Sequence, residues 1–362
     1  MNHKKLLVEL IEAFGPSGYE KATAALFRKE MEKYADSVKI DRAGNVIAHF
    51  KGTDPDAPIV MAYAHLDSIG FIVRKIEKDG FIGLDRLGGV PEKVLAGQAL
   101  SVLSTDGKLI PGVIGGKSHH AVSAEEKYVV TKINELYLDI GASDALHVRE
   151  LGIEIGCPAA YRGFAQYLAG DLISGTFLDN RGGLTALAAA GELLSADRPA
   201  SDVYLVGTVW EEFNLRGATL AARSIKPCIS ISLDASLSGD THDLGSLYET
   251  ACGKGPVLIH YTFHGRGTLN GTIAHSGLAQ LVIEAAKDEC LPLQHFSGIG
   301  VLTDSAYVQL ENDGPAALEL GFPVRYTHSP TEVASISDIY LLGKLLAATI
   351  SRIKSDFDLN RY

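Results

Sequence analysis

The chain has 362 residues, of which 46% are hydrophobic and 21% charged, values typical of a globular protein long enough for a full hydrophobic core. Its formal net charge of −11 argues against nucleic acid and anionic membrane surfaces as partners, because both repel an acidic protein. No apolar run reaches the ~18–20 residues of a membrane span, and four cysteines without a CxxC pair make a thiolate metal site unexpected.

The N-terminal segment is predicted to form an amphipathic helix over residues 6–14, which ends at Gly15-Pro16. Basic residues come first, as they do in a signal peptide. However, Glu9 and Glu12 interrupt the apolar core that a signal peptide needs. We therefore expect the protein to be cytoplasmic.

The next elements in chain order are a helix over 19–34, a strand pair within 37–50 and a buried strand over 59–64. From about residue 70 to 163 the pattern changes to short strand-like pieces split by glycines, such as "GFIVRKIE" and "LIPGVIG". This texture is typical of a small β-barrel or sandwich. After residue 170, helices alternate with buried strands again, as in "LTALAAAGELLSA" followed by "VYLVGTV".

The predicted fold is therefore α/β, with a mixed, largely parallel sheet that helices cover on both faces. A small β-barrel-like domain is inserted into it. We place the main domain at residues 1–66 and 165–362, and the β-rich insertion at residues 67–164.

Ionisable side chains stand where the predicted apolar strands stop. His65 follows "IVMAYA", Glu211 and Glu212 follow "VYLVGTVW", Asp234 follows "ISISL", and His328 follows "FPVRYT". In open α/β sheets the carboxyl ends of the strands form the functional crevice. Unrelated polar residues would not be expected to stop at the same edge so often.

Two further carboxylates join this set. Asp67 follows His65 by two residues, and Asp179 lies in "GTFLDNRGG" just before a predicted helix. Singly, each residue has a plainer explanation, such as a helix N-cap for Asp179 or a turn residue for Asp234. Together, two imidazoles and three carboxylates are the ligand set of a co-catalytic pair of divalent metal ions, in which one carboxylate bridges ions about 3.5–4 Å apart. His260 and His264 are weaker candidates, because strand-like surroundings give them no shared helical face.

Six motifs in this order resemble the glutamyl-aminopeptidase family, the tetrahedral co-catalytic metallo-aminopeptidases often named cellulase M or endoglucanase. They are "GPSGYE" (15–20), "AHLDSIGF" (64–71), "LDNRGG" (178–183), "EEFNLRGA" (211–218), "TDSA" (303–306) and "PVRYTHSPTE" (323–332). The similarity covers nearly the whole chain. It implies a metal-dependent aminopeptidase that removes N-terminal residues from short peptides. It also implies that the insertion is a dimerisation domain, and that dimers assemble into a tetrahedral dodecamer with the active sites inside.

The resemblance also implies a metal-binding role for five residues. His65 and Asp234 would bind one ion, Glu212 and His328 would bind the other, and Asp179 would bridge the two. Zinc and cobalt both suit these ligands, so the sequence does not choose between the metals. It does not give the preferred N-terminal residue either, because loops build the pocket walls.

Two residues that bind no metal also receive roles from the resemblance. Glu211 would be the general base, and Asp67 would orient His65. A cis peptide bond between Asp179 and Asn180 is implied as well. The chain departs from the family pattern at Ser68, where glutamate is usual, and at Asn214, where glycine is usual. Neither departure removes a ligand.

Three other functions compete with this interpretation. A metallo-carboxypeptidase or deacylase uses the same order of ligands, but its accessory domain usually falls before the last histidine, whereas this insertion falls between His65 and Asp179. An endoglucanase needs two carboxylates and no metal pair, which leaves the two histidines without a role. A non-catalytic assembly protein is disfavoured by the intact ligand set together with Glu211.

Overall fold

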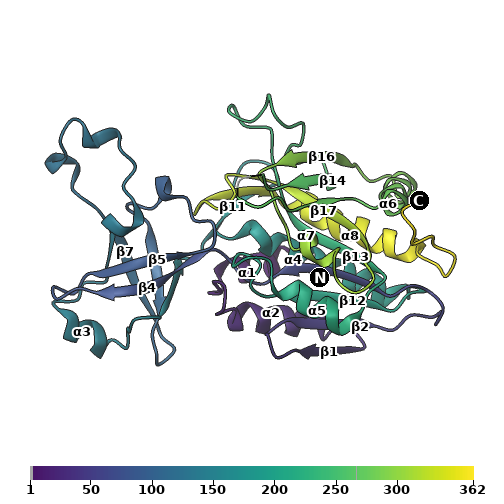
Figure 1. Ribbon diagram of the computed structural model, residues 1–362, viewed down its shortest axis with the longest axis horizontal. Coiled ribbons are helices and arrows are strands. Elements are labelled where there is room, and N and C mark those ends of the chain that lie inside the picture. Colours follow the sequence, from purple (N-terminus) through teal and green to yellow (C-terminus); the bar gives the residue numbers. More distant parts are fainter. Residues whose placement is uncertain (1–2, 266) are drawn as a thin grey trace.

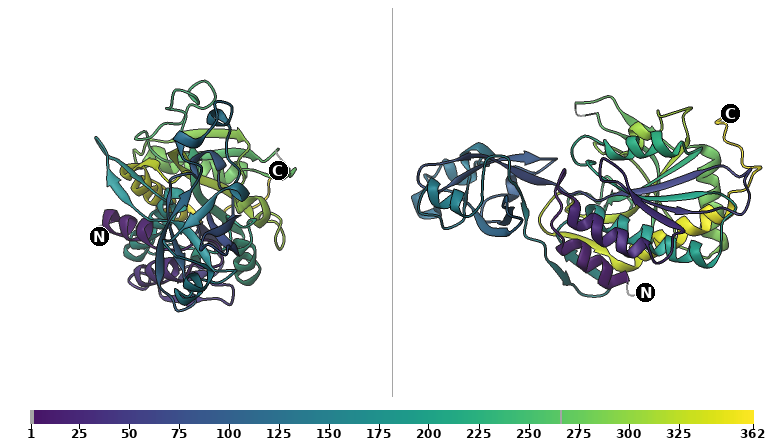
Figure 2. Two further views of the ribbon diagram at one scale, coloured as in Figure 1. Left: turned by 90° about the vertical axis from the view of Figure 1, so that its left-hand side faces the viewer. Right: turned by 90° about the horizontal axis from the view of Figure 1, so that it is seen from below.

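The computed structural model describes residues 3–265 and 267–362, which form two lobes (Figures 1 and 2). A large α/β lobe holds both the first and the last described residues. A small β-barrel made by residues between 70 and 161 projects from one end of it. The barrel is therefore an insertion into the α/β lobe, as the sequence predicts.

One 12-stranded sheet forms the centre of the large lobe. Along its main path the strands are β1 (Ser37–Ile40), β2 (Val46–Phe50), β12 (Val203–Thr208), β3 (Val60–His65), β13 (Ile229–Leu237), β17 (Ala316–Arg325), β18 (Glu332–Ser335), β11 (Leu172–Gly175) and β10 (Ala165–Tyr167). A branch from β17 consists of β14 (Val257–Phe263), β15 (Gly271–Ile273) and β16 (Gln294–Ile299). The central strands β12, β3, β13 and β17 are parallel, so their carboxyl ends meet at one edge.

Helices cover both faces of this sheet, and the residues of β3 show how. Val60 and Ala62 pack into the larger core with helices α1 (His3–Glu12), α2 (Lys21–Met31), α4 (Leu178–Ala196), α6 (Ser276–Asp288) and α8 (Ile336–Arg352). Met61 and Tyr63 pack into a second core with α5 (Gly217–Ile225) and α7 (Ser305–Val308). Because successive side chains of a strand point to opposite faces, a continuous apolar run is buried on both sides.

The barrel has its own hydrophobic core, which is separate from those of the large lobe. Its strands close in the order β4 (Gly70–Ile76), β5 (Ile82–Leu87), β8 (Tyr137–Asp139), β7 (Leu109–Gly115), β6 (Ala99–Leu103) and β9 (Pro158–Tyr161). Its short helices are α3 (Ala145–Glu150), η1 (Glu92–Val94), η2 (His119–Ala121), η3 (Glu126–Tyr128) and η4 (Ile133–Glu135). Phe71, Leu100 and Leu138 are fully buried inside it.

The predicted fold class is confirmed, and one strand differs in length. The sequence predicts a short strand at "FPVRYTH", but β17 begins six residues earlier, at Ala316. The extra residues pair in parallel with β13 from Ile229 onward, so they belong to the sheet. Within the described ranges, no helix is both long and apolar enough to cross a membrane.

Candidate metal centre and active site

The carboxyl edge of the parallel strands brings together all the predicted site residues. His65 is the last residue of β3, Asp234 lies in β13, and Glu211 and Glu212 follow β12. His328 comes three residues after β17. Asp179 reaches them from the first turn of α4, and the peptide bond that joins it to Asn180 is cis, as predicted. Residues far apart in the chain thus meet because their strands are neighbours.

Asp179 lies between the two histidines and faces each with a different oxygen. Its Oδ1 is 3.1 Å from Nε2 of His65, and its Oδ2 is 3.6 Å from Nε2 of His328. Nε2 of His65 is also 3.8 Å from Oδ1 of Asp234, and Nε2 of His328 is 3.7 Å from Oε2 of Glu212. Ligands about 2.0–2.2 Å from a tetrahedral ion lie roughly 3.3–3.5 Å apart, so these spacings suit metal binding.

Among the residues that the structure describes, three overlapping groups of side chains have donor atoms close enough to share an ion. One is His65, Asp179 and Asp234, and another is Asp179, Glu212 and His328. The third joins His65 with Glu211 and Glu212. The first two groups share Asp179 and together contain all five predicted ligands. The donor chemistry, imidazole nitrogen with carboxylate oxygen, fits a pair of divalent ions.

The buried carboxyl groups of the cluster also favour a positive charge beside them. Burial raises the pKa of the Glu211 and Asp234 carboxyls well above their ordinary values, and it raises that of Glu212 to about 7. Burial lowers the pKa of His65, but the charge of Glu211 and its other acidic neighbours outweighs this and raises it overall. So many carboxylates are costly to bury together unless cations accompany them.

Both histidines are held with Nε2 toward the cluster. Nδ1 of His65 donates to the backbone carbonyl of Asp67 at 3.0 Å, and Nδ1 of His328 donates to the carbonyl of Gly89 at 2.9 Å. Because a carbonyl only accepts, each Nδ1 carries the proton and each Nε2 keeps a lone pair for a metal. Gly89 follows barrel strand β5, so the inserted segment supports one of the predicted ligands.

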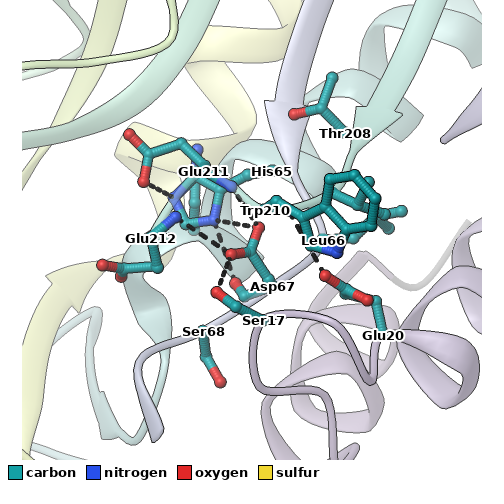
Figure 3. A network of polar contacts seen from close by, with 12 residues as sticks. Ser17, Glu20, His65, Leu66, Asp67, Ser68, Thr208, Trp210, Glu211 and Glu212 are labelled. Atoms are coloured by element: carbon teal, nitrogen blue, oxygen red, sulfur yellow. Dashed lines mark hydrogen bonds and ion pairs between the residues drawn. The ribbon is translucent and has the colours of Figure 1, made fainter. Parts of the chain in front are cut away.

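The Asp67 carboxylate mainly holds the backbone of the glutamate pair (Figure 3). Oδ1 accepts from the backbone N–H of Glu211 at 3.0 Å, and Oδ2 accepts from that of Glu212 at 3.0 Å. The hydroxyl of Ser17 donates to Oδ2 at 2.5 Å. The carboxylate is farther from His65, with Oδ1 3.6 Å from Nδ1. Figure 3 also marks the contact of Glu211 with His65, in which Oε2 is 3.9 Å from Nε2. Oε2 of Glu212 is instead 3.7 Å from Nε2 of His328, so the two side chains face different histidines.

Sequence reasoning gave no role to several residues that position the ligands. Buried Glu332 accepts from the backbone N–H of Asp179 at 3.0 Å and from that of His328 at 2.8 Å, so it joins two ligand segments. The side chain of Asn180 donates to the carbonyl of Leu233, beside Asp234. Fully buried Arg181 donates to the carbonyl of Leu66. These residues lie within the motifs quoted above, and no other feature of the sequence indicates their positioning roles.

A cavity of about 820 Å³ opens over the cluster. His65, Asp179, Glu211, Glu212, Asp234 and His328 form its floor. Gly88, Gly89 and Pro91 of the inserted segment contribute one wall, and loops after β13 and β16 contribute others. A cavity of this size, with the ionisable cluster inside it, has the form of an enzyme active site.

Comparisons with known proteins agree with this geometry. The family model described as M42 glutamyl aminopeptidase matches residues 44–345. The chain belongs to this family. Its members are aminopeptidases, so the protein is an enzyme that hydrolyses peptide bonds, and the predicted family resemblance is confirmed.

Two relatives and two solved structures extend over nearly the whole chain. SgcX of Escherichia coli (strain K12), which is named as an aminopeptidase, is 37% identical over 95% of this chain and 92% of its own length. The lysyl aminopeptidase of Pyrococcus furiosus is 33% identical over 97% of each chain. Aminopeptidase APDkam598 of Desulfurococcus kamchatkensis superposes with a TM-score of 0.92 at 31% identity, covering 98% of this chain and 96% of its own. The TET1 peptidase of Pyrococcus horikoshii, described as assembling into a tetrahedron or an octahedral shell, has a TM-score of 0.84 at 26% identity, covering 97% and 100%.

Proposed function

We propose that this protein is a metal-dependent aminopeptidase that uses two divalent ions to remove N-terminal residues from short peptides. The observation that carries the proposal is the position of Asp179, whose two oxygens face two separate histidines. A single ion would leave one of these oxygens and one histidine without a purpose. The family match supports the peptidase activity, and the donor set supports the metal pair.

In this proposal five side chains hold the ions. His65 and Asp234 bind one, Glu212 and His328 bind the other, and Asp179 serves both. Zinc is our first choice and cobalt the second, because both accept imidazole and carboxylate ligands. When bound, such a pair would lower the pKa of a shared water toward about 7 and would polarise the scissile carbonyl.

Glu211 is the general base of the proposed mechanism. Two of the possible ligand groups contain Asp179, and Glu211 is the carboxylate of the cluster that belongs to neither of them. Its Oε2 is 3.9 Å from Nε2 of His65. It accepts the proton of the attacking water and then delivers that proton to the departing amine. The free α-amine of the substrate lies near the ligand carboxylates, where its positive charge is favoured. Asp67 positions both glutamates through their backbone amides, and it holds His65 through its own carbonyl.

The competing functions are less well supported. In a carboxypeptidase or deacylase the accessory domain is expected before the last histidine, whereas here the barrel lies between His65 and Asp179. An endoglucanase has no use for two histidines whose Nε2 atoms face a carboxylate. A non-catalytic role leaves Glu211 buried among other acids for no benefit.

We also propose that residues 67–164 form a dimerisation domain, that residues 1–66 and 165–362 form the catalytic domain, and that dimers build a tetrahedral dodecamer. Two observations support this. The TET1 relative assembles into a tetrahedron, and the barrel exposes apolar side chains at Tyr128 and Val129, which are 92% and 69% exposed. Exposed apolar patches are typical of protein interfaces. A full-length protein that sediments as a monomer at micromolar concentration would contradict this assembly.

The activity is tested with amino-acid p-nitroanilides and their N-acetylated counterparts, assayed with and without a chelator. We expect hydrolysis only of substrates with a free amine, and only when metal is present. Equal turnover of acetylated and free substrates would favour a deacylase or endopeptidase. Hydrolysis of a β-glucan by metal-free protein would restore the endoglucanase.

A further inference from the structure

The cavity over the metal cluster has walls that suggest which N-terminal residue it accepts. We propose, on the basis of the function proposed above, that the enzyme prefers peptides whose N-terminal side chain is large and uncharged, such as leucine, methionine or phenylalanine. It would select against glutamate, aspartate, lysine and arginine. This differs from what the names of the family and of the Pyrococcus furiosus relative describe, which are glutamyl and lysyl aminopeptidases.

The first observation is the scarcity of fixed charge on the walls among the described residues, which leave out Arg266. Apart from the six residues of the floor, His264 is the single acidic or basic residue of that described set that lines the cavity. Its Nδ1 lies 3.3–3.4 Å from the hydroxyl and backbone nitrogen of Thr268, within its own hairpin. A pocket for glutamate would need a cation, and a pocket for lysine would need a carboxylate beyond the metal ligands.

The second observation is the apolar character of these walls. The loop after β13 contributes Leu244, Leu247 and Tyr248, and the loop after β16 contributes Val301 and Leu302. A charged side chain placed against such surfaces would lose its hydration without gaining a partner. A leucine or methionine side chain would instead remove apolar surface from water on both sides of the contact.

A third observation is that several apolar side chains of the lining are exposed. Leu247 is 66% exposed, Ile299 59% and Phe213 46%, and all three line the cavity. Apolar side chains left exposed together around one opening are typical of a ligand-binding surface. The three come from separate segments of the large lobe that meet at the opening.

The expected selectivity does not require one particular substrate pose. If the α-amine is held at the ligand carboxylates, the first side chain must enter one of the walls within reach of the floor. Among the described residues, those walls carry no acidic or basic residue apart from His264, so the selectivity has the same sign in every orientation that keeps the first side chain away from His264. A cavity of about 820 Å³ also leaves room for the largest aliphatic and aromatic side chains.

The test compares kcat/KM for the p-nitroanilides of leucine, methionine, alanine, glutamate and lysine. We expect leucine to exceed alanine roughly 10–100-fold, because more apolar surface is buried. Leucine should exceed glutamate and lysine by a factor on the order of 100, because their charge would be desolvated without a partner. Calorimetric binding of Leu-Ala, Glu-Ala and Lys-Ala dipeptides to the Glu211→Gln variant should give the same ranking without turnover.

Two variants of equal exposure locate the selectivity in the wall. Leu247→Lys adds a cation beside the cavity and should raise the ratio of glutamate to leucine turnover roughly 3–10-fold. Leu146→Lys is the control, because Leu146 is 67% exposed but lies on α3 of the barrel, outside the cavity. It should leave the ratio unchanged.

The outcomes separate the two levels of the proposal. A preference for glutamate or lysine, with a free amine and metal still required, overturns the inference and leaves the aminopeptidase function standing. An equal shift in both lysine variants also overturns it, because the cavity wall would then have no special part. Turnover that needs neither a free amine nor metal overturns the function itself.

Discussion

The barrel and the α/β lobe bury different kinds of side chain. Of the described side chains that are polar or charged and buried, Ser104 alone belongs to the barrel strands and their connections. The α/β lobe buries Asp67, Glu211, Asp234 and Glu332 near one edge, with Arg181 beneath them. The interior of the barrel is thus almost entirely apolar, whereas the large lobe buries charged side chains at its functional edge.

The two regions are nevertheless joined at the site. Gly89 follows barrel strand β5, and its carbonyl accepts a hydrogen bond from Nδ1 of His328. Gly88 and Pro91 of the same segment line the cavity. The barrel lobe therefore supports a proposed metal ligand even though its own core is separate.

Removing bound metal should have the largest effect, and that effect should be confined to the α/β lobe. A chelator is expected to abolish peptidase activity and to lower the unfolding temperature of the α/β lobe, whereas the barrel, with its separate core, keeps its own transition. An ion present at 100–1,000 times its Kd stabilises a fold by about 2.7–4.1 kcal/mol. Calorimetry with rate assays before and after adding zinc or cobalt measures both effects. Full activity in metal-free protein would contradict the proposal.

The two adjacent glutamates should respond differently to the same substitution. Glu211→Gln is expected to keep both ions and to lose roughly 10²–10⁴-fold in turnover, the range for a positioned general base. Glu212→Gln is expected to lose metal from the site that it shares with His328. Metal content and kcat of the purified variants distinguish these roles, with Glu126→Gln on the barrel surface as the control. Metal loss in Glu211→Gln alone would reverse the two roles.

Gly89→Ala tests the contact between the lobes. A Cβ at this position would lie 2.9 Å from Nδ1 of His328, so the imidazole must move. Disturbing the partner of a ligand typically costs roughly 10–100-fold in metal affinity or activity. The control is Gly116→Ala, whose Cβ would meet only Leu136 at an ordinary 3.5 Å. Equal, near-normal activity in both variants would mean that the barrel segment does not support the ligand.

Ser17→Ala tests whether Asp67 positions the glutamate pair. The variant removes the hydroxyl that donates to Asp67 Oδ2, and a hydrogen bond to a charged group contributes about 1.5–3 kcal/mol. Because part of this is shared with the two backbone donors, we expect kcat to fall roughly 5–10-fold while KM and metal content stay the same. Ser101→Ala in the barrel is the matched control. A change in KM with normal kcat would argue for a role in substrate binding instead.

The smallest effect is expected at a charged pair on the barrel surface. Lys117 lies 2.8 Å from Glu126, and both side chains are about half exposed. Exposed pairs of this kind contribute little, so Lys117→Ala should change the free energy of unfolding by less than about 0.5 kcal/mol and leave the kinetics unaltered. Urea denaturation of the variant and the native protein measures this. A loss above about 1 kcal/mol would show that the barrel depends on charge after all.

The sequence by itself determined the fold class, the inserted barrel and the residues that gather at the sheet edge. Side-chain periodicity is a local property, and a continuous apolar strand that ends at His65 or Asp234 indicates both its burial and its functional end. The role of Asp67 was only partly predictable. Its carbonyl contacts His65, but its carboxylate binds the amides of Glu211 and Glu212, which no local pattern reveals.

Only the tertiary structure decided the partners of the ligands and the walls of the cavity. Glu332 joins Asp179 to His328, and Gly89 holds His328 from a segment 239 positions away in the chain. Leu247, from the loop after β13, and Ile299, the last residue of β16, reach the same opening. Such contacts form when the packing of the whole sheet brings distant segments together. Loops have no side-chain periodicity from which these contacts could be predicted. The physical reason is that periodicity records which face of an element is buried, whereas a hydrogen bond or a pocket depends on which other element is buried against it.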